Sequence, residues 1–368
     1  MQLNIQRVDV FYHADRIGTL ALTPQGRAAF EYDASFLRGG FSISPFYLPL
    51  QQGVFLGKRD PFGGLHGVFN DSLPDGWGML LTDRLLRQYN IPLSSVNLLD
   101  RLSLIGENGM GALIYRPAWL KPEISNVEKH DFGLIAREVR EILQEKYQGN
   151  IEDYFVKGGS SGGARPKILI NFEGENWLVK FRSSSDPDHI GEIEFNYSIA
   201  AKKCSIEMTE TRLFEGKYFG TRRFDREGGQ RFHVISASGL LHASHRYPSL
   251  DYVDLIKAVN AVTKDIEEAY KLFRLMVFNV VNGNKDDHAK NFSFIYRNGS
   301  YKLSPAYDLV PSSGFNGQHT TTIAGSGVPE KSNLIEVARQ TGLSEKRAQQ
   351  ILDEVIEGSS GLEQYTEK

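Results

Sequence analysis

The sequence has a single cysteine, no long apolar run and almost no net charge, and each absence excludes a class of protein. Because Cys204 is the one cysteine in 368 residues, neither an intrachain disulfide framework nor a cysteine-rich metal site can form. No segment approaches the roughly 18 consecutive apolar residues of a membrane span, and the first residues, MQLNIQRVDVFY, contain no signal-peptide core. We therefore expect a cytoplasmic protein with no membrane partner.

Charge of one sign is also missing. Lys and Arg number 42 and Asp and Glu number 45, which gives a net formal charge of −3. Near neutrality argues against a basic nucleic-acid surface over the whole chain, although a local basic patch stays possible. The composition is 40% hydrophobic and 24% charged, as in globular proteins, and the length suggests about two or three packing units.

The first part of the chain predicts a small antiparallel sheet followed by helices. Alternating runs at 8–12, 19–22 and 28–32 are typical of strands. From 75 to 89 apolar residues recur at spacings of three and four, which predicts a helix with one apolar stripe, and a second helix is expected at about 95–104. This part of the chain therefore reads as a unit of its own.

Two prolines and a polar stretch then place a domain junction between Pro117 and Asp131, and Asp131 is suited to cap a helix over 132–147. A Gly/Ser-rich segment at 158–163 leads into a hairpin of strands and a helix. The further elements expected are strands at 166–172, 176–181, 214–224 and 232–235, and helices at 192–203 and 266–282. The last of these helices is apolar on most faces and is expected to be buried.

The densest polar cluster follows that buried helix. Seven of the eight positions from Asn284 to Asn291 are polar or charged, and Asp308 lies 22 residues after Asp286. A solvated turn is the plain alternative for such a loop. Two carboxylates and an amide oxygen on neighbouring loops are, however, suitable ligands for the magnesium ion of a nucleotide.

The chain carries the parts of a protein kinase in the order in which kinases use them. The glycine-rich loop with Gly162 and Gly163 comes first, and then a strand lysine and a helix glutamate. A D-x-x-x-x-N pair and a metal-binding aspartate follow. In this chain the last four parts are Lys180, Glu194, the pair Asp286 and Asn291, and Asp308. Agreement of order and spacing together is far more specific than any one part.

These segments resemble the HipA-like kinases of bacterial type II toxin–antitoxin systems. The matching segments are SSGGARPK at 160–167, VK at 179–180, RFDR at 223–226, DDHAKNFS at 286–293 and PAYD at 305–308. FNDSLPDG at 69–76 and GENGMGAL at 106–113 are similar to the amino-terminal domain of the family. The resemblance covers most of the chain, to about residue 357.

The resemblance implies an α+β fold, in which a small α+β amino-terminal domain precedes a two-lobed kinase with a β-rich N-lobe and a helical C-lobe. The expected boundaries are 1–118 for the amino-terminal domain, 119–240 for the linker helix and N-lobe, and 241–368 for the C-lobe. Two positions depart from the family pattern: Arg165 and Pro166 stand where Gln and Glu are expected. Pro166 removes a backbone N–H and stiffens the end of the loop.

The resemblance also implies roles. Asp286 would accept or orient the proton of the substrate hydroxyl, in a catalytic loop that includes Lys290. His288 would orient this loop, with a purely structural role as an equal alternative. Asn291 and Asp308 would hold Mg²⁺. The residues expected to bind ATP are Lys180 and the glycines Gly162 and Gly163 at the phosphates, Glu194 beside the lysine, with Glu192 as a rival, and the main chain near Arg222 and Phe224 at adenine.

The resemblance further implies a serine/threonine kinase that is the toxin of a toxin–antitoxin pair and uses ATP and Mg²⁺. Its substrate would be a translation component of the aminoacyl-tRNA synthetase type. Ser160, with Ser161 as a rival, would be autophosphorylated, and the added charge would repel the nucleotide and inactivate the kinase. A HipB-like helix–turn–helix antitoxin would be its partner and would bring it to DNA indirectly.

Four other interpretations remain to be weighed. The first is a catalytically weak pseudokinase that binds a regulator. The second is direct DNA binding by a helix pair at 334–357, but residues 328–358 carry four basic and six acidic side chains, which favours packed helices. The third is a nucleophile elbow, because 158–162 fits G-x-S-x-G, but a strand follows that segment where the elbow needs a helix. The glycines at 106, 109 and 111 lack a dinucleotide-binding context and indicate a packing or turn role.

Overall fold

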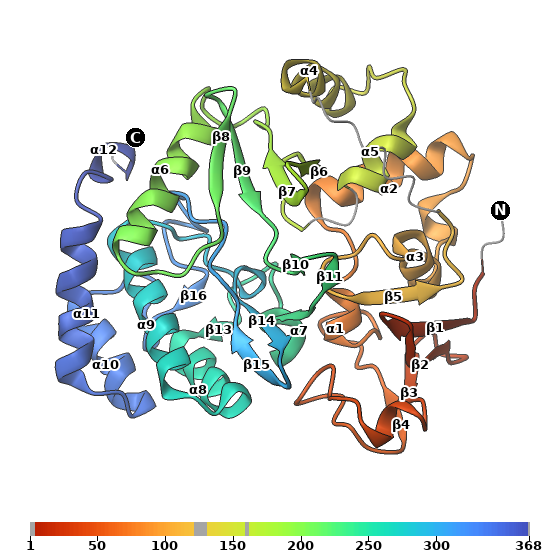
Figure 1. Cartoon of the computed structure of the whole chain (residues 1–368), viewed down its shortest axis with the longest axis horizontal. Helices are drawn as coiled ribbons and strands as arrows, with labels where there is room; N and C mark the ends of the chain where they lie inside the picture. Colours follow the sequence, from red (N-terminus) through yellow and green to blue (C-terminus); the bar gives the residue numbers. More distant parts are fainter. Residues whose placement is uncertain (1–3, 121–130, 159–161, 367–368) are drawn as a thin grey trace. The chain divides into compact units, whose positions relative to one another are not determined.

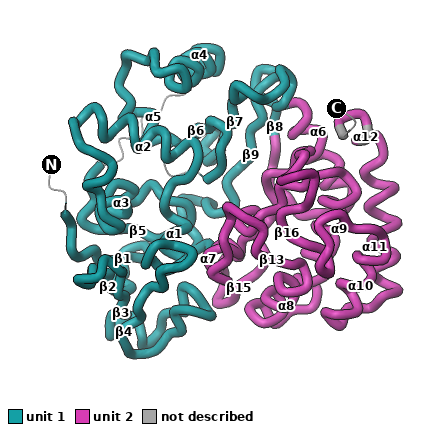
Figure 2. The backbone as a smooth tube through the Cα atoms, turned by 180° about the vertical axis from the view of Figure 1, so that it is seen from behind, with its two compact units in different colours: residues 1–191, 212–235 teal, residues 192–211, 236–368 magenta. Residues whose placement is uncertain are grey.

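The computed structural model describes residues 4–120, 131–158 and 162–366 and contains both sheets and helices (Figure 1). This confirms the α+β class. The chain forms two compact units, one of residues 1–191 with 212–235 and the other of residues 192–211 with 236–368 (Figure 2). Much of the predicted junction between Pro117 and Asp131 lies outside the described residues, and the three-part division stays a prediction.

Unit 1 begins with a five-stranded antiparallel sheet of order β4-β3-β2-β1-β5. Its strands alternate apolar and polar residues, so that Val8, Val10, Leu20 and Phe30 lie buried on one side. The strands predicted at 8–12, 19–22 and 28–32 are thereby confirmed. The elements of this part are β1 (Arg7–Tyr12), β2 (Asp15–Leu22), β3 (Ala28–Tyr32), η1 (Phe36–Arg38), β4 (Val54–Leu56), α1 (Gly67–Asn70), α2 (Gly76–Gln88), η2 (Leu93–Ser95), α3 (Leu98–Ile105) and β5 (Leu113–Arg116).

A second sheet of unit 1, of order β6-β7-β9-β8, follows the Gly/Ser-rich segment. The predicted hairpin is confirmed as β6 and β7, which pair from Lys167 with Lys180 to Phe172 with Glu175. The elements are α4 (Phe132–Leu143), α5 (Ile151–Gly158), β6 (Lys167–Phe172), β7 (Glu175–Lys180), β8 (Thr211–Phe214), β9 (Tyr218–Arg222), β10 (Arg226–Glu227), β11 (Gln230–Arg231) and β12 (His233–Ser236). Asp131 caps α4 as expected, because its side chain accepts a hydrogen bond of 2.8 Å from Leu134 N.

One hydrophobic core joins α2 to this second sheet. Trp77 and Leu81 of α2 are buried in the same cluster as Trp177 and Val179 of β7, and α5 packs on both α2 and β6. Helix α5 is short, and no pattern in the sequence predicted it. Because a helix precedes the Gly/Ser-rich segment and a strand follows it, the segment lacks the context of a nucleophile elbow.

Unit 2 is mainly helical. Its elements are α6 (Ile190–Lys203), which begins at the end of unit 1, α7 (Ala237–Leu241), β13 (Leu250–Asp251), α8 (Tyr252–Thr263), α9 (Ile266–Val281), η3 (Ala289–Asn291), β14 (Ser293–Arg297), β15 (Ser300–Leu303), β16 (Thr321–Thr322), α10 (Lys331–Thr341), α11 (Glu345–Gly358) and α12 (Glu363–Thr366). Helix α9 is buried along most of its length, as predicted, with Leu272, Phe273, Met276 and Phe278 fully covered. Within the described residues, no helix is long and apolar enough for a membrane span.

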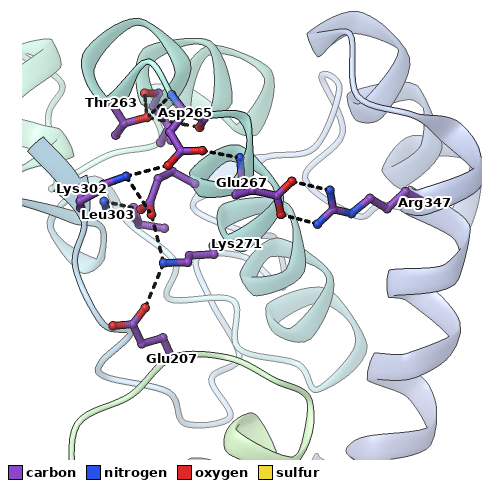
Figure 3. Close-up of polar contacts among 10 residues, drawn as sticks. Glu207, Thr263, Asp265, Glu267, Lys271, Lys302, Leu303 and Arg347 are labelled. Carbon is purple, nitrogen blue, oxygen red and sulfur yellow. Dashed lines mark hydrogen bonds and ion pairs between the residues drawn. The ribbon is translucent and has the colours of Figure 1, made fainter.

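Charged side chains connect the start of α9 to its neighbours (Figure 3). Lys302 of β15 contacts Asp265 at 2.6 Å, and Lys271 bridges to Glu207 at 3.1 Å. The guanidinium of Arg347 on α11 pairs with Glu267. Helix α9 therefore forms the centre of unit 2, and the polar segment that follows it starts from a fixed position.

Candidate functional site

The predicted catalytic segment follows α9 directly and is held together by its own backbone. Asp286 is exposed to solvent. Its carbonyl oxygen accepts a hydrogen bond of 2.7 Å from the Asn291 side-chain amide, and Asn291 N donates to His288 O at 2.8 Å. The two residues of the D-x-x-x-x-N pattern are thus in direct contact, and the turn between them is closed.

The neighbouring residue, Asp287, is buried, and its carboxylate receives four hydrogen bonds. One carboxylate oxygen accepts from Tyr252 Oη at 2.9 Å and from His319 Nδ1 at 2.8 Å. The other accepts from the backbone N–H groups of Thr320 at 2.9 Å and Thr321 at 3.2 Å. A carboxylate can only accept, so His319 Nδ1 is the donor. Asp287 therefore anchors the segment while Asp286 faces solvent.

The anchor continues into the core of unit 2. Tyr252 Oη accepts from Asn279 of α9 at 3.0 Å, and Asn279 accepts from Asn284 at 3.0 Å. Burial, reinforced by the Asp287 charge, raises the pKa of Tyr252 well above its ordinary value, so this hydroxyl stays a neutral donor. Sequence reasoning gave Asp287 no role and did not single out His319 or Tyr252. The only available signal was the position of Asp287 inside the matched box.

His288 and Lys290 organise the turn through backbone groups. His288 Nδ1 accepts a hydrogen bond of 3.2 Å from Lys290 N and so caps the short helix η3. Lys290 O accepts a hydrogen bond of 2.6 Å from Tyr307 Oη. This last contact ties the turn to the segment that carries Asp308. His288 thus makes a contact of the kind expected if its role is purely structural.

Asp308 has a backbone φ of 58°, in the left-handed region that non-glycine residues rarely adopt. Such conformations are costly and concentrate at functional sites. The amide nitrogen of Asn291 is committed to Asp286 O, and an amide oxygen such as that of Asn291 is a ligand type that magnesium accepts. In the part of the chain that the structure describes, no group of three or more His, Cys, Asp or Glu residues forms a metal site.

Of the two candidate helix glutamates, only one is buried. Glu194 of α6 is 2% exposed, whereas Glu192 lies on the exposed side of the same helix. A carboxylate is buried only where charged or hydrogen-bonding groups compensate for the loss of water. Burial therefore favours Glu194 for a role inside the protein. Glu194 belongs to unit 2, together with Asp286, Asn291 and Asp308.

The remaining predicted residues lie in unit 1. Lys180 ends β7, with its Nζ 5.7 Å from the centre of the Phe219 ring. Gly162 and Gly163 precede β6, whereas Ser160 and Ser161 lie outside the described residues. The residues proposed for adenine, Arg222 and Phe224, lie at the end of β9 and just beyond it.

Two of the segments that resemble the family, RFDR at 223–226 and GENGMGAL at 106–113, contact each other inside unit 1. The buried carboxylate of Asp225 accepts hydrogen bonds from Arg223 at 2.8 Å and 2.6 Å and from Gly111 N at 2.7 Å. Arg226 donates to Gly111 O at 2.7 Å, and Arg231 donates to Glu107 O at 2.7 Å. The segment beside Phe224 is therefore bonded to the glycine-rich segment 106–113, which agrees with the packing or turn role expected of these glycines.

Comparisons with known proteins agree with this architecture. A model of the HipA-like C-terminal domain matches residues 159–360, and a model of the HipA N-terminal domain matches residues 8–116. Y4dM of Sinorhizobium fredii, which carries a provisional kinase designation, is 24% identical over 95% of this chain and 89% of its own length. A Haemophilus influenzae protein with the same designation is 26% identical over 43% of this chain and 54% of its own length.

Among solved structures, a chain from the Shewanella oneidensis MR-1 toxin–antitoxin complex of HipA, HipB and operator DNA has a similar fold. Its TM-score is 0.73 at 19% identity, over 97% of this chain and 91% of that chain. The chain, with its sheet-rich unit and its mainly helical unit, thus has the α+β fold of that HipA structure. Since the C-terminal model alone matches more than half of the sequence, the chain belongs to the HipA-like family.

Proposed function

We propose that this protein is a serine/threonine protein kinase that uses ATP and Mg²⁺ and acts as the toxin of a toxin–antitoxin pair. The observation that carries the proposal is the hydrogen bond between the Asn291 side chain and the Asp286 carbonyl. It lies in a turn that the buried Asp287 anchors. In kinases the aspartate at this position accepts the proton of the substrate hydroxyl, and the asparagine binds metal.

In this proposal each candidate residue has its own role in phosphoryl transfer. The exposed carboxylate of Asp286 accepts the hydroxyl proton as the new bond to phosphorus forms. Asn291 and Asp308 supply oxygen ligands for Mg²⁺, which neutralises charge on the phosphates when bound. Lys180, with Gly162 and Gly163, contacts the phosphates, and the buried Glu194 orients the lysine. The main chain at Arg222 and Phe224 meets adenine.

The family also supports a proposal for regulation and partners. Phosphorylation of Ser160, or of its rival Ser161, adds about −1.5 to −2 charge beside the phosphate site and inactivates the kinase. A HipB-like helix–turn–helix protein is the partner, and the solved relative in complex with HipB and operator DNA supports this choice. DNA is reached through that partner. The substrate is a protein of translation of the aminoacyl-tRNA synthetase type.

The test is transfer of the γ-phosphate of labelled ATP, with magnesium, to the chain itself and to aminoacyl-tRNA synthetases. Asp286→Asn keeps the shape of the side chain and removes the base, so we expect incorporation to fall by about a hundredfold or more. Asp353→Asn, at an exposed aspartate of α11, is the matched control and should retain full activity. Equal incorporation by wild type and Asp286→Asn would remove Asp286 from the mechanism. Nucleotide binding without any transfer would instead indicate a pseudokinase.

A further inference from the structure

The start of helix α2 lies against residues 162–166, which lead from the Gly/Ser-rich segment into β6. We call these residues the loop exit. Asp75 is the N-cap residue of α2, yet its side chain makes no hydrogen bond to the first turn of its own helix. An aspartate at this position ordinarily accepts from the second or third backbone N–H of the helix. Here its Oδ1 accepts instead from Gly163 N.

The contact is reciprocal. Trp77 N, in the first turn of α2, donates to Gly163 O at 3.2 Å. Gly163 therefore uses both its N–H and its carbonyl on the start of one helix. The Trp77 indole Nε1, which is buried, donates to Lys167 O at 3.0 Å, at the point where the loop exit becomes β6. Three hydrogen bonds thus connect the start of α2 to Gly163 and to Lys167, the first residue of β6.

The contact requires glycine at position 76 for lack of space, and the backbone conformation favours glycine at both 76 and 163. Gly76 has a φ of +43°, and a Cβ there would lie 2.6 Å from Ala164 Cα and would also collide with Gly163 O. Gly163 has a φ of +87°, and a Cβ there would meet Lys167 Nζ at 2.7 Å. Since a Cβ at Gly76 would collide with the backbone of the loop exit, and both glycines have a positive φ, the two backbones approach closely enough for direct hydrogen bonds.

The loop exit is also held on its other side. Arg165, one of the departures from the family pattern, pairs with Asp186 at 3.1 Å. Burial opposes ionisation of Asp186, but hydrogen bonds from Ser183 and the guanidinium of Arg165 lower its pKa below the ordinary value. Pro166 O accepts from Phe181 N at 2.8 Å, which continues the sheet. The loop exit thus has a fixed conformation in unit 1.

We propose that Asp75, with Gly76 and Trp77, is a positioning element of the nucleotide site, which holds the phosphate-binding loop from the amino-terminal part of the chain. This inference rests on the proposed function, because it assumes that the loop that includes Gly162 and Gly163 binds phosphate. Since the N–H of Gly163 is committed to Asp75, the contact would fix the loop, and other donors of the loop would meet the phosphates. Backbone N–H groups can bind phosphate tightly only when they are held in place beforehand. The motif FNDSLPDG at 69–76 then contributes directly to nucleotide affinity, through contacts that lie wholly within unit 1.

The experiment compares Asp75→Ala, which removes the acceptor, with Asp75→Asn, which keeps an oxygen for Gly163 N. Asn97→Ala is the matched control: Asn97 caps α3 in the ordinary way, with Leu99 N at 2.8 Å, so its loss costs a helix cap elsewhere in the same unit. Two properties of the full chain are measured. One is amide hydrogen exchange over residues 162–168 without nucleotide, and the other is the dissociation constant of magnesium AMP-PNP by calorimetry.

We expect Asp75→Ala to accelerate exchange over residues 162–168 and to weaken binding of AMP-PNP by about tenfold, the equivalent of one ordering hydrogen bond. Asp75→Asn should restore most of both, and Asn97→Ala should change neither. Unchanged affinity in Asp75→Ala, or an equal loss in Asn97→Ala, overturns the proposal. If the wild-type chain binds no AMP-PNP, the proposed function fails together with the positioning role, and the exchange data still show separately whether Asp75 orders the loop exit.

Discussion

At the scale of single residues, two adjacent aspartates have opposite environments and therefore opposite roles. Asp286 is exposed and is our candidate base, whereas Asp287 is buried and accepts four hydrogen bonds. The first aspartate of the pair is thus the candidate for the chemical step, and the second stabilises the structure. A substitution at each position should consequently affect a different measurable property.

Asp287→Asn should destabilise the protein. The amide presents a donor where the carboxylate accepted from Tyr252, His319 and two backbone groups, so buried donors are left without a partner. We expect a loss of about 2–4 kcal/mol in the free energy of unfolding, or roughly 5–15 °C in the melting temperature of unit 2. Asp286→Asn should leave the melting temperature nearly unchanged, and calorimetry of both variants checks this. Equal melting temperatures for the two variants would contradict the assignment of Asp287 as the anchor.

A buried histidine in unit 1 predicts sensitivity to mild acid. His233 is fully buried, its Nε2 lies 2.9 Å from Ile43 O, and burial lowers its pKa to about 4. The unfolded chain binds a proton at this residue below pH 6.5, whereas the folded chain does not. Stability is thus complete above pH 6.5 and is lost as the pH falls toward 4, by up to about 3 kcal/mol.

Urea unfolding between pH 7.5 and 5 measures this loss. His233→Gln offers Ile43 O a donor that does not titrate, so its free energy of unfolding should fall less steeply over that range, even if it is lower at pH 7.5. Carboxylates with lowered pKa values, such as Asp186, lose their contribution only below their ordinary range near 4. Identical pH slopes for the wild type and His233→Gln would therefore exclude His233 as the cause.

At the scale of elements, the sequence predicted what local patterns determine. Helices α2 and α9 and the β6–β7 hairpin follow from the spacing of apolar residues within each segment. Helix α5 was not predicted, because eight residues give little periodicity. The contacts that anchor Asp287 were not predicted either, since Asp287 and His319 are 32 residues apart and Tyr252 and Asp287 are 35 apart. Such contacts depend on how the elements pack, and no spacing rule predicts them.

The helix pair α10 and α11 illustrates how an element is held in place. Helix α10 packs on α8 and helix α11 on α9, as expected for helices that close the unit. Leu352 of α11 is buried, so Leu352→Ala should cost about 2–5 kcal/mol through lost contacts and a cavity. Arg347→Ala on the same helix should shift the melting temperature only slightly, because its partner Glu267 is more than half exposed. Thermal melts of both variants test this, and the reverse order would contradict packing as the dominant cause.

At the scale of the whole molecule, the two family domains do not coincide with the two compact units. Unit 1 contains the amino-terminal sheet and also the sheet that carries Lys180. Asp75 and Gly111 each connect an amino-terminal motif to a motif of the expected kinase N-lobe. The amino-terminal domain is thus structurally continuous with the candidate ATP-binding sheet, and substitutions in it should be tested for effects on nucleotide binding.

Charge and packing over the whole chain also predict how it meets DNA. The net charge is −3, and the segment 328–358 has more acidic than basic residues. Its helices α10 and α11 bury their apolar stripes within unit 2. We therefore expect the isolated chain to show no salt-dependent retardation of duplex DNA in a gel-shift assay. A chain carrying Glu345→Lys and Asp353→Lys, at exposed positions of α11, is the matched control and should bind DNA weakly at low salt. Wild-type binding that weakens steeply with salt would show that the chain contacts DNA itself and would remove the need for a partner.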